Sequence, residues 1–305
     1  MKKNSKKINL RYGENPNQSA FLFSNNNKSI FHFQISGKKI SYNNIIDVDS
    51  GLRCLNEFSE PTSIIIKHTN PCGVASGRKI QDAFLKSYQS DSKSAFGGII
   101  FLNRKVDLNL ANKIYKNFFE MVVATDFEDR AVKKLKMKKN LILLKIPNVK
   151  KQIKSYRSTI FGELHQTNDI TPINKNFLNL SSRKKASVKQ IDDLIFSLKV
   201  VKHLKSNAVV LVKNKQTVGL GHGQTNRIDA LNFAIKNKYI YFKNKSFVCA
   251  SDGFFPFTDS INLLKKNGCN IVAQPNGSIN DKDIINFASK NNISLYFIKN
   301  RLFKH

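Results

Sequence analysis

The stretch IIIKHTNPCGVASG, residues 64–77, combines the pattern of a buried strand with polar chemistry at its end. Three consecutive isoleucines predict a strand covered on both faces, as in a parallel sheet with helices on each side. Lys67 and His68 follow directly, and Pro71 and Gly73 then predict a loop. Ligands of open α/β sheets bind where strands end, so Lys67 and His68 are candidate functional residues. A lysine extending to solvent beside a histidine bonded at a strand end explains the pattern equally well.

Similar short apolar runs recur along the chain and alternate with amphipathic segments of helical period, which predicts an α/β fold. We expect a parallel sheet covered by helices on both faces. Residues 208–221 differ, because two extended runs flank Lys-Asn-Lys and predict a hairpin. The predicted strands are 63–67, 121–124, 141–144, 247–250, 270–274 and 294–298, and the predicted helices are 80–90, 108–119, 128–137, 188–203, 228–237, 259–267 and 281–291.

Two parts of the chain contain the same order of elements. GRKIQDAFLKSY from Gly77 resembles TNRIDALNFAIK from Thr225, and SAFGGIIFLNRKVD from Ser94 resembles CASDGFFPFTDSI from Cys249. Similarity at this spacing indicates an internal duplication. The sequence therefore predicts two similar α/β/α units, at 1–150 and 188–305, joined by a polar connector at 151–187.

The chain is strongly basic, with 51 Lys and Arg against 21 Asp and Glu and a net charge of +30. Such a charge is typical of proteins that bind nucleic acid. Here the lysines are scattered through every segment among Asn and Ile, a distribution that we attribute to codon usage in an A- and T-rich genome, and no DNA or RNA recognition motif accompanies them. The charge therefore favours anionic small substrates over a specific nucleic acid.

Length and composition indicate a globular protein of the cytoplasm. The 305 residues contain 41% hydrophobic residues, enough for one large or two modest cores. No apolar run is long enough to span a membrane, and no signal-peptide core follows the basic N-terminus. The four cysteines lie far apart without a Cys-x-x-Cys spacing, so we expect reduced thiols rather than a zinc ribbon or a redox pair.

Four further motifs each allow two interpretations. LRYGENPNQ (10–18) suits a phosphate site or a surface turn, and GLGHGQTNR (219–227) suits an anion cradle or a hairpin end before a capped helix. SDGFFPF (251–257) fits a core plug better than a ligand platform, and NRLFKH (300–305) by default is a frayed end. Taken singly, none of these motifs identifies a reaction.

Taken together and in this order, the motifs resemble the AICAR transformylase family. The set comprises LRYGENPNQ, ISYNNIIDVDSG, KHTNPCGVASG, SAFGGIIFLNR, VVKHLKSNAVVLVKNKQTVGLGHGQTNRIDA, ASDGFFPFTDSI, QPNGSINDKDII and RLFKH, from Leu10 to His305. In this family the transformylase is one domain of a bifunctional purine-biosynthesis enzyme, and the other domain is IMP cyclohydrolase. Because nine residues precede LRYG, the sequence predicts that the cyclohydrolase domain is absent.

The resemblance implies a fold of two cytidine-deaminase-like α/β/α units. It implies transfer of a formyl group from 10-formyltetrahydrofolate to the 5-amino group of AICAR, which gives FAICAR and tetrahydrofolate. The partners would be AICAR and a reduced folate as co-substrate, in a homodimer with shared active sites. No catalytic metal, specific nucleic acid or membrane is expected.

The resemblance also assigns roles to residues of this chain. His68 would be the general base on the amine, and Lys67 would stabilise the transition state or help to protonate the leaving folate nitrogen. An amine conjugated to a carboxamide ring is a poor nucleophile, so its proton must leave as it attacks. The amide of Asn207 or the Lys67 cation would meet the developing oxyanion. Nucleotide contacts would come from Arg11, Tyr12, Gly97, Glu120, Arg227, Phe254, Arg301, Phe303 and His305, and folate contacts from Ile228, Asp259, Ser278 and Ile279.

Three positions depart from the family pattern. Asn17 replaces a usual histidine, His222 replaces a usual alanine, and Glu120 replaces an aspartate found in some members.

A zinc deaminase is the competing enzyme with a related fold. It needs a His or Cys followed by Glu together with Pro-Cys-x-x-Cys, whereas NPCGVAS supplies a single cysteine, so the sequence excludes this alternative.

Overall fold

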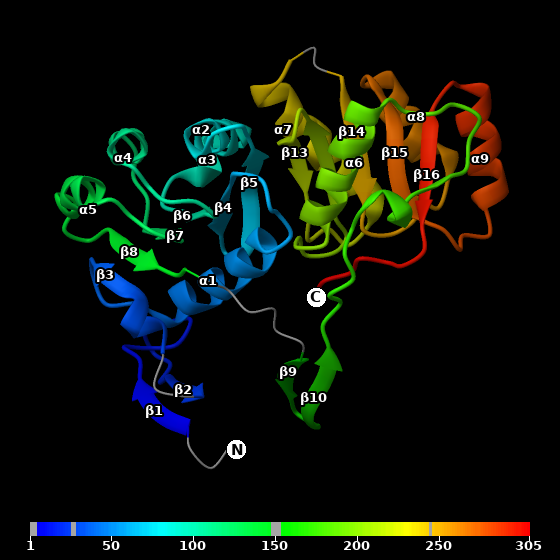
Figure 1. Ribbon diagram of the computed structural model, residues 1–305. Helices are drawn as coiled ribbons and strands as arrows, with labels where there is room; N and C mark the ends of the chain where they lie inside the picture. Colours follow the sequence, from blue (N-terminus) through cyan, green and yellow to red (C-terminus); the bar gives the residue numbers. More distant parts are fainter. Residues whose placement is uncertain (1–4, 26–28, 148–153, 244–245) are drawn as a thin grey trace.

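A computed structural model describes residues 5–25, 29–147, 154–243 and 246–305, and it confirms a mixed α/β protein (Figure 1). Twelve strands form one sheet in the order β11-β16-β15-β14-β12-β13-β5-β4-β6-β7-β8-β3. Two separate hairpins, β1–β2 and β9–β10, complete the strands of the described part. None of the described helices has the length and apolar composition needed to cross a membrane.

The first half of the chain supplies one side of the sheet. Its sheet strands are β3 (Gln34–Ser36), β4 (Thr62–Lys67), β5 (Asn70–Ser76), β6 (Ile99–Leu102), β7 (Met121–Ala124) and β8 (Ile142–Lys145). Its helices are η1 (Ile30–Phe33), α1 (Tyr42–Leu55), α2 (Ile80–Ser90), α3 (Ser92–Ala95), α4 (Leu108–Tyr115) and α5 (Asp129–Lys136), and β1 (Ser5–Asn9) and β2 (Phe21–Asn25) precede them.

The second half supplies the other side. Its sheet strands are β11 (Asn179–Leu180), β12 (Val209–Lys213), β13 (Gln216–Gly221), β14 (Phe247–Ser251), β15 (Cys269–Pro275) and β16 (Ser294–Ile298). Its helices are α6 (Val188–Val201), α7 (Arg227–Tyr241), α8 (Thr258–Lys266) and α9 (Asp281–Lys290). Between the halves lie β9 (Lys154–Thr159), β10 (Gly162–Thr167) and η2 (Lys175–Phe177).

The two halves have the same strand arrangement. β4 pairs antiparallel with β5 and β6, while β6, β7 and β8 are parallel. In the same way β12 pairs antiparallel with β13 and β14, while β14, β15 and β16 are parallel. The halves join where β13 meets β5, at Gln216 and Ala75. This likeness is architectural; the origin by duplication and the boundaries of the two units stay predictions.

Helices cover both faces of the sheet, and one core runs across the join. Side chains of α1 and α6 share a buried apolar cluster with β4 and β12, so this face has a common core for both halves. On the opposite face α2, α4 and α5 pack over the first half, and α7, α8 and α9 pack over the second half. The three isoleucines of β4 are fully buried, as their sequence predicts.

Several local predictions were wrong. β4 is not parallel to its neighbours, and the residues after Thr69 form strand β5 rather than a loop. Pro71 is accommodated because the β4–β5 register shifts beside it, at Ile65 and Ile66, where a ladder hydrogen bond can be lost. The predicted helix 108–119 stops at Tyr115, and the predicted helix 228–237 runs on to Tyr241. The connector contains the hairpin β9–β10, whose side chains are mostly exposed.

Candidate active site

Lys67 and His68 lie at a tight reversal between β4 and β5. Lys67 pairs with Asn70, so His68 and Thr69 alone form the turn. Both have positive φ, 52° for His68 and 65° for Thr69. Two-residue hairpins use this left-handed conformation, but it is unfavourable for a β-branched threonine. The turn therefore needs support from its surroundings.

Helix α1 gives that support. Asp47 Oδ1 accepts the backbone N–H of Thr69 at 2.6 Å, and Ser50 Oγ donates to the Thr69 carbonyl at 2.6 Å. The two side chains lie three residues apart and therefore on one face of the helix. Burial raises the pKa of Asp47, while its bond to Thr69 and the nearby His68 act in the opposite direction. The turn is thus fixed through its backbone, and the His68 side chain stays exposed.

Lys67 and His68 line a pocket between the halves. Lys67 Nζ donates to the Phe96 carbonyl at 2.9 Å. His222, at the end of β13, lies in the same pocket, and burial lowers its pKa, with a smaller contribution from the charge of Lys304. The pocket also contains Asn70, Cys72, Asp91, Ser94 and Thr217. Burial raises the pKa of the Cys72 thiol to about 12, so it is protonated at neutral pH.

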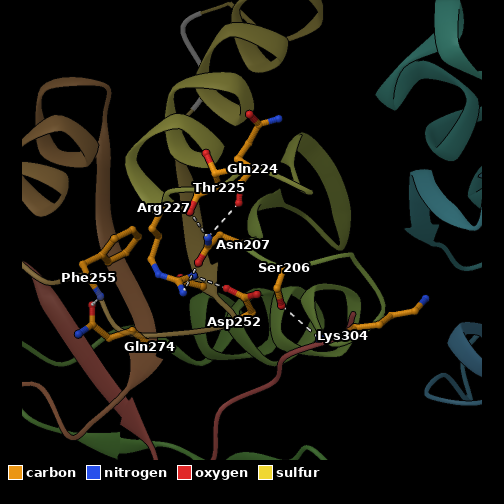
Figure 2. Close-up of polar contacts among 10 residues, drawn as sticks. Ser206, Asn207, Gln224, Thr225, Arg227, Asp252, Phe255, Gln274 and Lys304 are labelled. Atoms are coloured by element: carbon orange, nitrogen blue, oxygen red, sulfur yellow. Dashed lines mark hydrogen bonds and ion pairs between the residues drawn. The ribbon is translucent and has the colours of Figure 1, made fainter. Parts of the chain in front are cut away.

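A second cluster centres on Arg227, whose guanidinium has three partners (Figure 2). It forms an ion pair with the fully buried Asp252, donates to Asn207 Oδ1 at 2.7 Å and donates to Ser251 Oγ at 3.1 Å. The amide nitrogen of Asn207 in turn donates to the backbone carbonyls of residues 224 and 225, at 2.9 and 3.2 Å. Both amide hydrogens of Asn207 therefore have acceptors inside the protein in this structure.

The C-terminal tail brings aromatic rings and a second guanidinium to the same cluster. Arg301 lies 5.5 Å from the Phe254 ring and 5.6 Å from the Phe303 ring, while Arg227 lies 5.9 Å from the Phe303 ring. A Cβ at Gly253 would lie 2.3 Å from Arg227 Nη2, so only glycine permits this approach. Asp252 balances the charge of Arg227, so the exposed Arg301 guanidinium gives this surface the positive charge that suits an anionic ligand.

The tail is docked rather than frayed. The Leu302 N–H donates to the Asp252 carbonyl at 2.9 Å, and the Ser206 N–H donates to the Lys304 carbonyl at 2.9 Å. Leu302 is buried, whereas Arg301 and Phe303 are exposed. His305 lines a shallow pocket with Phe303 and Asn207. The tail therefore presents its polar and aromatic side chains at the site.

Nearly all the predicted site residues follow or precede strand ends at one edge of the sheet. This edge is the carboxyl end of β4 and of β14, β15 and β16, and the amino end of β6, β7 and β12. The expectation of a carboxyl edge of parallel strands therefore holds only for the second half. Gly97 and Glu120 precede β6 and β7, Ile228 follows β13, and Asp259, Ser278 and Ile279 follow β14 and β15. Glu120 forms an ion pair with Lys38 at 2.6 Å.

Arg11 and Tyr12 stand apart from this edge in sequence, in the loop after β1. Arg11 is exposed and lies 5.4 Å from the Tyr12 ring. Asn43, at the start of α1, donates to the Glu14 carbonyl at 3.1 Å and ties this loop to the first half. No three His, Cys, Asp or Glu side chains of the described residues are arranged as metal ligands.

Sequence reasoning missed Asp47, Ser50 and Asp252. Asp47 and Ser50 carry a signal, because their spacing of three puts them on one face of any helix. Asp252 is an acidic residue directly after the apolar strand β14. Its partner Arg227 lies 25 positions away in sequence, so no local pattern shows the ion pair.

The chain is similar to a group of proteins from purine biosynthesis. Residues 1–237 match the AICARFT/IMPCHase bienzyme family. The bifunctional purine biosynthesis protein PurH of Caldicellulosiruptor bescii is 45% identical over 304 residues and covers 97% of this chain. Proteins of the same name from Buchnera aphidicola and Aquifex aeolicus are 43% and 41% identical and cover 98% and 97% of it.

This chain spans 58–59% of the length of those relatives, so it corresponds to part of a bifunctional protein. The part matched by the family includes the turn with Lys67 and His68. This chain belongs to the AICARFT/IMPCHase bienzyme family.

Proposed function

We propose that this chain is an AICAR transformylase. It would transfer the formyl group of 10-formyltetrahydrofolate to the 5-amino group of AICAR and release FAICAR and tetrahydrofolate. The observation that carries the proposal is the pairing of an exposed base, His68, with a cation, Lys67, on a rigid turn at the sheet edge that also holds Arg227 and Arg301. Family membership and the transformylase motifs support the same assignment.

Formyl transfer needs a base at the attacking amine and a positive charge beside the oxygen of the formyl group. His68 accepts a proton from the amine as its nitrogen attacks the formyl carbon. The formyl oxygen becomes an oxyanion, and the Lys67 ammonium stabilises it; only one of its three hydrogens is needed for the Phe96 carbonyl. The bond from the formyl carbon to the folate nitrogen then breaks, and that nitrogen takes up the proton that His68 removed from the amine, delivered with the help of Lys67. The Asn207 amide could join only after leaving its two carbonyl partners, so the oxyanion role falls first to Lys67.

The remaining site residues bind the two substrates in this proposal. Arg301 and Arg11 would hold the AICAR phosphate, since a guanidinium pairs with two phosphate oxygens at once. The other predicted nucleotide contacts, Tyr12, Gly97, Glu120, Arg227, Phe254, Phe303 and His305, would orient the ring and ribose. Ile228, Asp259, Ser278 and Ile279 would bind the folate, with Asp259 accepting hydrogen bonds from the pterin.

The same assignment extends to assembly. We propose a cytoplasmic homodimer whose active sites are shared between subunits, made of two duplicated cytidine-deaminase-like units. Its reaction needs no catalytic metal, because Lys67 supplies the positive charge. Sedimentation across a dilution series tests the dimer, and an active protein that stays monomeric at all concentrations would overturn it.

The direct test of the reaction is spectroscopic. Purified chain with AICAR and 10-formyltetrahydrofolate should produce tetrahydrofolate, followed by its absorbance, and FAICAR, followed by chromatography. Omission of AICAR is the control, because it separates transfer from simple hydrolysis of the folate. AICAR-independent release of tetrahydrofolate, or none at all, would refute the proposal.

A further inference from the structure

A half-buried lysine in the C-terminal tail connects the two parts of the site. Lys304 lies between Phe303 and His305, but its side chain extends away from the Arg227 cluster (Figure 2). Its Nζ donates to the His203 carbonyl at 3.0 Å and to Ser50 Oγ at 3.3 Å. Ser50 belongs to α1 in the first half, so this contact crosses from one half to the other.

The contact continues to the turn that holds His68. Ser50 Oγ accepts from Lys304 and donates its own proton to the Thr69 carbonyl at 2.6 Å. A hydroxyl that accepts from a cation becomes a better donor, because consecutive hydrogen bonds polarise one another. The ammonium group of Lys304 therefore strengthens the bond that fixes Thr69, the residue next to His68.

Removing the Lys304 ammonium group from water has a free-energy cost. The Lys304 side chain is partly buried, and this burial lowers the pKa of its ammonium group. A buried cation is unfavourable unless hydrogen bonds compensate it. The tail itself is docked by the backbone of Leu302 and Lys304, which does not need the ammonium group. The ammonium group is thus available for a purpose other than holding the tail.

We propose that Lys304 is a positioning residue that holds the His68 turn in its catalytic geometry through Ser50. The inference rests on the proposed function, in which His68 is the base and the tail binds the nucleotide. A second contact also runs from the second half to this turn. The Lys205 N–H donates to Asn70 Oδ1 at 3.2 Å, at the other end of the turn. The second half therefore sets where the base of the first half stands relative to the nucleotide.

Two variants of Lys304 test the role of its charge. Lys304→Met keeps the length of the side chain and removes the donor. We expect kcat to fall by about tenfold or more, the equilibrium worth of one charged hydrogen bond. The KM for AICAR should change less than about threefold, because Arg301 and Phe303 stay docked through the tail backbone. Lys304→Arg restores a charged donor and should recover most of kcat.

A double-mutant cycle tests the route through Ser50. Ser50→Ala should lower kcat in the same way, and the double variant should lose less than the product of the two single losses, since both act on one bond chain. Lys265→Met is the matched control, because Lys265 Nζ donates to Asn291 Oδ1 at 2.6 Å on the surface, and its loss should leave kcat unchanged.

A measurement without catalysis separates this inference from the proposed function. In protein labelled at histidine ring carbons, the His68 resonances, assigned with His68→Gln, should shift in both Lys304→Met and Ser50→Ala but not in Lys265→Met. This readout stands even if the wild-type chain forms no tetrahydrofolate. If Lys304→Met does not fold, Ser50→Ala carries the same test. Unshifted His68 resonances, or single losses of kcat that multiply, would overturn the inference.

Discussion

Gly253→Ala tests the geometry of the Arg227 cluster. The φ of Gly253 is not positive, so the backbone accepts alanine and the effect comes from the new methyl group. That methyl would lie 2.3 Å from Arg227 Nη2 and 2.8 Å from Phe303 Cε1, well inside van der Waals contact. Arg227 cannot simply rotate away, because Asp252, Asn207 and Ser251 hold its guanidinium.

The expected loss of stability follows from the hydrogen bond that the new methyl group would break. Relief of the contact moves Nη2 by about 1 Å and breaks its hydrogen bond to Asn207, which is worth roughly 1.5–3 kcal/mol for a charged group. Urea unfolding should show a loss of stability in this range. Titration calorimetry should show AICAR binding weakened by about tenfold or more, because both Arg227 and Phe303 are displaced from the proposed nucleotide site.

The control is Gly268, whose replacement should lower stability at a position away from the Arg227 cluster. Gly268 has φ of 87° and lies before β15, at the opposite edge of the sheet, with nothing within 4 Å of an added Cβ. Gly268→Ala should lower stability by about 1 kcal/mol through its backbone alone and leave AICAR affinity unchanged. Equal AICAR affinity in Gly253→Ala and the wild type would refute the role of the Arg227 cluster in nucleotide binding.

Three further predictions follow from the same structure. His68→Ala should lower kcat by ~10²-fold or more with AICAR affinity changed less, in steady-state kinetics and calorimetry, since general-base catalysis contributes on this scale; activity within a few-fold of wild type would remove His68 from the mechanism. Arg11→Ala and Arg301→Ala should each weaken AICAR binding by ~1.5–3 kcal/mol and leave folate binding unchanged, measured by calorimetry; normal AICAR binding in both would place the phosphate elsewhere. Burial lowers the pKa of His203 and His222 below the ordinary 6.5, so below that pH the unfolded chain binds more protons and the free energy of unfolding should fall between pH 7.5 and pH 5.5; an equal or higher value at pH 5.5 in urea titrations would contradict this assignment.

The apolar patterns predicted most of the sheet and helices. The helix 80–90 has the predicted bounds, and residues 208–221 form the predicted hairpin within one residue. These elements follow from local periodicity, which a single sequence carries. The pairing of β4 did not follow, because a buried apolar strand has the same composition in parallel and antiparallel sheets.

The turn at His68 and Thr69 was not predicted, because a loop was expected at Pro71 and Gly73 after it. It lacks the Asn-Gly or Asp-Gly signal of a two-residue hairpin, and Pro71 and Gly73 nearby resemble a loop signal. Its left-handed backbone is held by Asp47 and Ser50, which are 22 and 19 positions from Thr69 along the chain. Helix α1 itself was not predicted. Such support is a tertiary effect, and local sequence does not display it.

The candidate residues were found through the motifs, whereas their supports were found only in the structure. Lys67, His68, Arg227 and Arg301 belong to distinctive motifs with turn residues or glycines beside them. Lys304 lies in the same tail motif as Phe303 and His305, but only its contacts with His203 and Ser50 distinguish it from the many surface lysines of this basic chain.

The most direct test of the central claim is the rate of AICAR-dependent tetrahydrofolate formation by the wild-type chain and by His68→Ala, measured with saturating AICAR and 10-formyltetrahydrofolate. We predict that the wild type forms tetrahydrofolate and FAICAR in equal amounts and that His68→Ala loses at least ~10²-fold of this rate while it still binds AICAR. A wild-type chain that binds both substrates but transfers no formyl group would contradict the account.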